Sequence, residues 1–137
     1  MSMEVFTSVA VNYIPKARVL AESCKAHQPD ARLHLLVTDE LPEAFDLTAE
    51  PFDTVVTPEQ LNIPDLRPWL FGHTLVEACT AVKPFALKYL LQQGAERVCY
   101  FDPDIALFAP LTPIEDAFSD HSILLTPHIC EPEQTLE

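Results

Sequence analysis

Short runs of aliphatic and β-branched residues alternate with stretches of helical pattern, and this alternation constrains the fold more than any other feature. The runs occupy residues 5–11, 32–38 and 97–101, with a shorter one at 54–57. Between the first two runs, behind Pro15, apolar residues recur at i, i+3, i+4 and i+7, as on the buried face of a helix. Nearly continuous apolar runs are typical of parallel strands that are covered on both faces. The sequence therefore predicts an α/β fold, a three-layer sandwich around a mainly parallel, Rossmann-like sheet.

The second half of the chain extends this pattern. A helix is expected from about residue 69 or 73 to residue 81, and a second helix follows, with Pro84 at its first position and Gly94 just past its end. Further strands are expected at 105–108 and 122–126, with helical turns at 59–61 and 114–118. We interpret residues 1–135 as one domain and Leu136-Glu137 as a cloning scar, so the domain is expected to be a truncated part of a longer protein.

Composition and charge exclude several classes of ligand. Eight Lys and Arg against 21 Asp and Glu give a net charge of −13, so no nucleic-acid partner is expected. The two glycines cannot form a glycine-rich phosphate loop. No apolar run has the length of a membrane span, and no export signal is visible, which favours a cytoplasmic location. The cysteines lack C-x-x-C spacing and lie in apolar stretches, which predicts reduced core thiols at Cys24, Cys79, Cys99 and Cys130.

Two aspartates stand where the apolar run 97–101 stops. Ligands of parallel α/β sheets bind at the carboxyl ends of the strands, so this is a suitable place for a site. In an extended segment Asp102 and Asp104 point to the same side, and both carboxylates can then hold one hard cation. The plainer interpretation is that Asp102-Pro103 initiates a turn and leaves Asp104 in solvent.

The helix before this run adds positive potential at the same edge. It is expected to run antiparallel to the strands, which places Lys83 and the helix N-terminus beside the two aspartates. A cation, a helix N-terminus and a carboxylate pair together favour a metal-bound diphosphate. The plainer interpretation of Lys83 is a solvated residue at a helix end.

The residues that carry these features resemble a known enzyme family. The segments FTSVAVNY at 6–13, AVKPFALKYLL at 81–91 and RVCYFDPDI at 97–105 are similar to the core of nucleotide-sugar glycosyltransferases with the GT-A fold, particularly family 8 and glycogenin-like enzymes. The resemblance implies that Asp102 and Asp104 hold Mn²⁺ or Mg²⁺ across the donor diphosphate and that Lys83 contacts the donor. It also implies that the first strand and its loop cradle the nucleoside, through Thr7, Val9, Asn12 and Tyr13.

The function implied by this resemblance is metal-dependent transfer of a glycosyl group from a nucleotide diphosphate sugar, expected to be a UDP-sugar, to an unknown acceptor. The alternative is a non-catalytic module that binds a nucleotide sugar or a metal. A haloacid-dehalogenase phosphatase is less favoured, because Ala106 stands where that motif has Thr or Val and the first run carries no Asp. An apolar face left by a missing partner half would favour a homodimer.

Three further residues have a suitable position but no motif. Asp39 follows the run 32–38, at the edge where a base or ribose would bind. His128 follows the last expected strand, and a lone histidine there is more typical of surface or packing than of a third metal ligand. Glu77 fits a helix acid better than a site residue.

Overall fold

The sheet of this protein consists of four parallel strands in the order β3-β2-β1-β4. It is seen in a computed structural model that describes residues 3–127. The pairing of β1 with β2 places Phe6 opposite His34, and its pairing with β4 places Phe6 opposite Tyr100. This parallel arrangement confirms the predicted α/β class. The strands are β1 (Glu4–Val9), β2 (Arg32–Val37), β3 (Thr54–Val56) and β4 (Val98–Tyr100).

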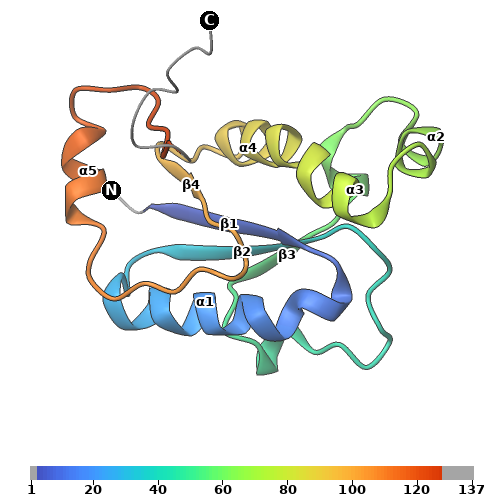
Figure 1. The fold of residues 1–137 in the computed structure, drawn as a ribbon, viewed down its shortest axis with the longest axis horizontal. Helices are drawn as coiled ribbons and strands as arrows, with labels where there is room; N and C mark the ends of the chain where they lie inside the picture. Colours follow the sequence, from blue (N-terminus) through green and yellow to red (C-terminus); the bar gives the residue numbers. More distant parts are fainter. Residues whose placement is uncertain (1–2, 128–137) are drawn as a thin grey trace, which may run out of the picture.

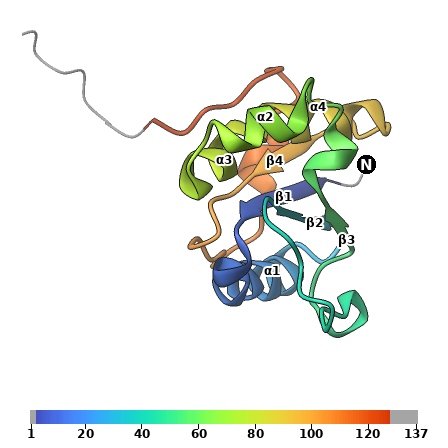
Figure 2. The same cartoon turned by 90° about the vertical axis from the view of Figure 1, so that its right-hand side faces the viewer.

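Helices lie on both sides of this sheet (Figures 1 and 2). Helix α1 (Ile14–His27) runs along one face, whereas α3 (Leu75–Ala81) and α4 (Lys83–Gln92) run along the other. Two apolar clusters result, and the neighbouring β2 residues Leu35 and Leu36 are buried in different ones. No helix within residues 3–127 is long and apolar enough to cross a membrane. The shorter helices are α2 (Leu66–Phe71), α5 (Thr112–Ala117) and the 3-10 turns η1 (Val11–Tyr13), η2 (Leu47–Ala49) and η3 (Pro58–Leu61).

The ends of α4 follow the signals in its sequence. Gly94 has a φ of 97°, in the left-handed region that favours glycine. Its N–H donates to the Leu91 carbonyl at 3.1 Å, and the Ala95 N–H donates to the Leu90 carbonyl at 3.1 Å. Both bonds belong to the Schellman motif that ends many helices. At the other end the helix begins with Lys83, one residue earlier than predicted, and Pro84 lies in the first turn.

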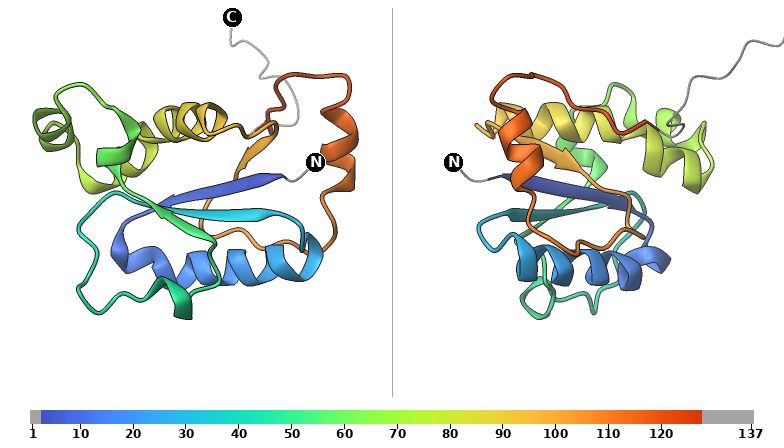
Figure 3. Two further views of the ribbon diagram at one scale, coloured as in Figure 1. Left: turned by 180° about the vertical axis from the view of Figure 1, so that it is seen from behind. Right: turned by 60° about the vertical axis from the view of Figure 1, so that its left-hand side comes forward.

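The strand predicted at 105–108 is wrong. After β4 the chain turns back across the α1 face of the sheet on its way to α5 (Figures 1 and 3). Leu107 and Leu111 are buried in the cluster around α1, and their backbone N–H groups donate to Ser23 Oγ at 2.9 Å and Gln28 Oε1 at 3.1 Å. The side chains of Ser23 and Gln28 thus accept the backbone hydrogen bonds that a neighbouring strand would otherwise accept, and the segment packs against α1 without joining the sheet.

Two other predictions also need correction. Residues 122–126 form no strand, because their apolar pattern has no ladder partner within the described part of the chain, and Ile123 and Leu125 are exposed. Of the two starts predicted for the helix that ends at residue 81, the one near residue 73 is close to the observed α3, which Thr74 caps, whereas a start at 69 is wrong because residues 66–71 form the separate helix α2. The helical turns expected at 59–61 and 114–118 are present as η3 and α5.

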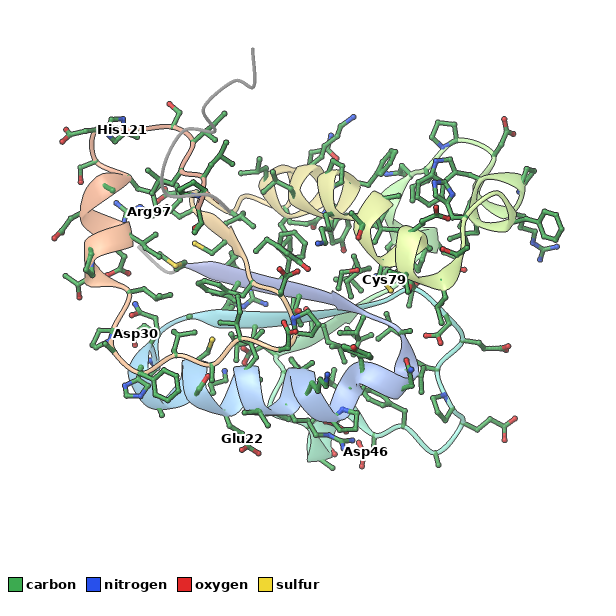
Figure 4. All side chains as sticks on the ribbon, in the orientation of Figure 1. Glu22, Asp30, Asp46, Cys79, Arg97 and His121 are labelled. Carbon is green, nitrogen blue, oxygen red and sulfur yellow. The ribbon has the colours of Figure 1, made fainter. Side chains whose placement is uncertain are left out.

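The cysteines of the described residues are free thiols, as predicted. Cys24 is fully buried, and burial raises the pKa of its thiol to about 11. Burial likewise raises the pKa of Cys99 to about 11. Cys79 departs from the core assignment, because it is only partly buried and lines a cavity on the sheet side of α3 (Figure 4). Cys130, His128 and the terminal pair Leu136-Glu137 lie outside the described residues.

Candidate functional site

A cavity of about 250 Å³ lies at the carboxyl edge of the sheet, between the end of β1 and the helices α3 and α4. This is the edge at which parallel α/β sheets bind their ligands. Its walls combine aliphatic, aromatic, hydroxyl, amide and charged side chains, a mixture typical of a small-molecule site. The lining residues come from the first strand and its loop (Ser8, Val9, Ala10, Asn12, Tyr13), from α3 and α4 (Leu75, Val76, Cys79, Thr80, Lys83) and from the end of β4 (Tyr100, Asp102, Pro103).

Lys83, Tyr100 and Asp102 form a contact cluster on one wall of this cavity. Lys83 Nζ lies 3.4 Å from Asp102 Oδ1, and the Tyr100 hydroxyl donates to the same oxygen at 2.6 Å. Lys83 Nζ also lies 4.2 Å from the centroid of the Tyr100 ring, within range of a cation–π contact. The predicted meeting of Lys83 and Asp102 at this edge is therefore confirmed, and Tyr100 orients both groups.

Tyr100 is held in its neutral form. Its burial raises the pKa of the phenol well above the usual range, and the hydrogen bond to the Asp102 carboxylate raises it further. Both effects disfavour the phenolate. We therefore expect the increase in phenolate absorbance with pH to be the same in the wild-type protein and in the Tyr100→Phe variant up to about pH 11. The two spectra should differ only by the constant absorbance of one neutral phenol. Extra phenolate absorbance in the folded wild-type protein below that pH would contradict the buried, hydrogen-bonded environment.

Asp102 and Asp104 do not lie in an extended segment. The Ile105 N–H donates to the Asp102 carbonyl at 3.1 Å, which closes a β-turn with Pro103 and Asp104 at its centre. The turn interpretation is thus correct for the backbone, and the assumption of strand geometry is wrong. Asp102 lines the cavity, whereas Asp104 is exposed beside it and is not part of the lining.

The first strand and its loop contribute three of the four predicted nucleoside-binding residues to the cavity. Val9, Asn12 and Tyr13 line it, and Tyr13 as a residue is 41% exposed. One face of the Tyr13 ring is approached by Lys16, whose Nζ lies 4.4 Å from the centroid. Thr7 does not line the cavity and is almost fully buried.

Asp39 and Glu77 are occupied by backbone contacts. Asp39 Oδ1 accepts a hydrogen bond of 2.8 Å from the Val11 N–H, which fixes the loop that follows β1. Glu77 accepts from both the backbone N–H and the hydroxyl of Thr74 in a capping box, and these bonds lower the pKa of its carboxyl group. Glu77 therefore has the helix role expected for it, and Asp39 positions the loop that carries Asn12 and Tyr13.

The lining residues that are absent from the sequence-based candidates include Ser8, Cys79 and Tyr100. Tyr100 lies within an apolar run and has the pattern of a strand residue, while Cys79 has the pattern of a core residue. Ser8 is flanked by apolar residues, and the alternation of side chains along β1 is the one signal that could have placed it in the cavity. The alternation of side chains is informative only when it is known which face of the sheet carries the cavity.

The structure brings one carboxylate of the predicted metal-binding pair to the cavity, because Asp102 lines it and Asp104 does not. Within residues 3–127 no group of three or more His, Cys, Asp or Glu side chains could hold a metal by itself. Mg²⁺ sites commonly combine one or two carboxylates with substrate phosphates and water, so the carboxylate of Asp102 is of a kind that can take part in such a site. Binding of Mn²⁺ or Mg²⁺ by Asp102 and Asp104 therefore stays a prediction.

Comparison with models of known protein families finds no match, and a search of curated proteins finds no significant match. The fold and the site residues are thus the basis for a functional assignment.

Proposed function

We propose that this chain is the donor-binding part of a metal-dependent, nucleotide-sugar glycosyltransferase with the three-layer GT-A fold. The observation that carries the proposal is the cavity at the carboxyl edge of the sheet, in which Tyr13, Lys83 and Asp102 come together from three separate elements. A nucleoside diphosphate offers a flat base, a ribose and a polyanion, and the cavity wall offers an aromatic ring, an amide and a cation. The donor expected from the family resemblance is a UDP-sugar, and the acceptor is unknown.

The nucleoside would lie against the first loop. Tyr13 offers part of its ring for stacking, an interaction that contributes about 1–3 kcal/mol per base in nucleic-acid complexes. Asn12 supplies an amide that can donate to and accept from a base edge. Leu75 and Val76 add apolar surface to the same cavity.

The diphosphate would lie against Lys83 and the aspartates. Asp102 and Asp104 would hold Mn²⁺ or Mg²⁺, which when bound neutralises the leaving diphosphate as the glycosidic bond breaks. Lys83 would donate to phosphate oxygens from the first turn of α4, where the helix dipole adds positive potential. Local positive charge of this kind is what a chain with a net charge of −13 needs to bind a polyanion.

The alternative is a module that binds the nucleotide sugar without transferring the sugar. Such a module would use the same cavity and the same lining residues as the transferase. A binding experiment therefore tests both functions, and turnover of the donor distinguishes the transferase from the module. The phosphatase alternative needs Thr or Val two residues after the second aspartate, and Ala106 stands at that position.

The nucleotide class is tested by thermal shift with UDP, GDP, ADP and CDP, each with and without Mn²⁺. A ligand at about 100 times its dissociation constant stabilises the native state by about 2.7 kcal/mol, enough for a clear rise in melting temperature. We expect UDP to stabilise the protein with Mn²⁺ and to have a much smaller effect with EDTA. No stabilisation by any of the four nucleotides would contradict the proposal.

Lys83 is tested against a lysine of the same helix. Lys83→Gln is expected to weaken UDP binding about 10- to 100-fold, because a charge-assisted hydrogen bond to phosphate is lost. Lys88→Gln removes the same charge from an exposed position that does not line the cavity, and it should leave the affinity nearly unchanged. Isothermal titration with UDP and Mn²⁺ compares the two. An equal effect of both substitutions would mean that Lys83 acts only through the net charge.

A further inference from the structure

The cavity holds its charges as an ion pair. Among the described residues that line it, Lys83 and Asp102 carry the charges, and Lys83 Nζ lies 3.4 Å from Asp102 Oδ1. The two side chains are 27% and 53% exposed, so both are open to solvent. The positive and the negative charge partly cancel each other. A ligand of one sign that enters alone therefore meets a group that already has a partner of that sign.

The lysine is held more loosely than the aspartate. The Tyr100 hydroxyl donates to Asp102 Oδ1 at 2.6 Å, whereas the contact of Lys83 with the same oxygen is 3.4 Å long. Hydrogen bonds between an ammonium and a carboxylate are usually about 2.7–2.9 Å long, so the lysine contact is weak. Because its four-carbon side chain is flexible, Lys83 can leave Asp102 while Tyr100 keeps the carboxylate in place.

A cation that binds Asp102 competes with this lysine. The ammonium and a divalent cation are drawn to the same carboxylate, and like charges at such short range repel each other. Lys83 therefore lowers the affinity of Asp102 for a cation as long as it stays on that carboxylate. An anion has the converse difficulty, since Asp102 competes with it for the ammonium. A cation and an anion that enter together relieve both conflicts, because each takes one member of the pair.

We propose that the ion pair between Lys83 and Asp102 is an autoinhibitory contact that couples the binding of a divalent cation to the binding of a nucleoside diphosphate. The inference rests on the proposed function and adds a regulation of the same site. Lys83 occupies Asp102 in the free protein, leaves it when a cation binds there, and then donates to phosphate oxygens. Each ligand raises the affinity for the other, and by thermodynamic linkage the two increases are equal.

The test measures Mn²⁺ at Asp102 without any nucleotide. Paramagnetic broadening of the Asp102 amide signal during a Mn²⁺ titration gives the affinity at this carboxylate, apart from the other acidic groups of the chain. We expect Lys83→Gln to bind Mn²⁺ there about 3- to 10-fold more tightly than the wild type, because the competing ammonium is gone. Lys83→Arg keeps the charge and should bind Mn²⁺ as the wild type does. Lys88→Gln removes a positive charge at an exposed position outside the cavity and should also match the wild type.

The two effects expected of Lys83→Gln have opposite signs, since its UDP binding in the presence of Mn²⁺ should weaken. A merely disturbed site would lose affinity for both ligands. A Mn²⁺ affinity that is unchanged or lower in Lys83→Gln, or an equal gain in Lys88→Gln, would overturn the inference. If the wild type still binds UDP with Mn²⁺, such a result removes the autoinhibitory contact alone. Failure of the wild type to bind any of the four nucleotides would instead remove the proposed function together with this contact.

Discussion

Replacing Asp102 and Asp104 together by asparagine is expected to abolish Mn²⁺-dependent binding of UDP, with a loss of affinity of about 100-fold or more. The substitution removes both negative charges while keeping the size of the side chains. A hard divalent cation strongly prefers carboxylates to amides of the same shape, because the charge of the carboxylate supplies most of the attraction. The residual affinity should resemble that of the wild type in EDTA. Isothermal titration with and without Mn²⁺ measures both quantities.

The fold should survive this double substitution. Both aspartates are exposed, and an asparagine oxygen at position 102 can still accept the Tyr100 hydrogen bond. Asp30→Asn with Asp120→Asn is the matched control, because it changes the net charge equally at two exposed positions outside the cavity. Wild-type Mn²⁺ dependence in the Asp102/Asp104 variant would show that the ion, if one is bound, is held elsewhere.

Leu35→Ala and Leu36→Ala are each expected to lower the free energy of unfolding by about 2–5 kcal/mol. The two leucines are 0% and 1% exposed and belong to the clusters on opposite faces of the sheet. Each truncation leaves a cavity under a different helix layer, α1 for Leu35 and α4 for Leu36. Such a loss is a large part of the total stability of a domain, which is about 5–15 kcal/mol.

Urea unfolding followed by circular dichroism measures these losses, with Leu91→Ala as the control. Leu91 lies on α4 with 48% of its surface exposed, so its truncation should cost less than about 1 kcal/mol. If Leu36→Ala behaved like Leu91→Ala, the packing of α4 on the sheet would be contradicted. The paired result therefore tests whether both faces of the sheet are covered.

The parts of the fold that follow from local patterns could be predicted. The runs that became β1 and β2 are rich in aliphatic residues and are buried over nearly their whole length, and α4 carries a buried stripe with Pro84 and Gly94 at its ends. Residues 105–108 and 122–126 have similar apolar character but form no strands. A strand needs a neighbour with free backbone groups, and nothing in the local sequence specifies that neighbour.

The site could be predicted where chain direction sets the position. Lys83 and Asp102 meet because helices and strands of such folds run antiparallel, which holds whatever side chains surround them. The assignment of Thr7 to the nucleoside is different. Both faces of β1 are buried, so alternation alone does not tell which face carries a cavity, and Ser8 rather than Thr7 lines it.

The most direct test of the central claim locates Mn²⁺ on the protein. Amide NMR spectra of the wild-type protein are recorded with UDP while Mn²⁺ is added in small amounts, since the paramagnetic ion broadens the signals of nearby amides. The account predicts that the amides of Asp102, Asp104 and Lys83 broaden first and that those of Asp30 and Asp120 broaden last. Early broadening at Asp30 or Asp120, or no dependence of the pattern on UDP, would contradict a shared metal and nucleotide site at the carboxyl edge of the sheet.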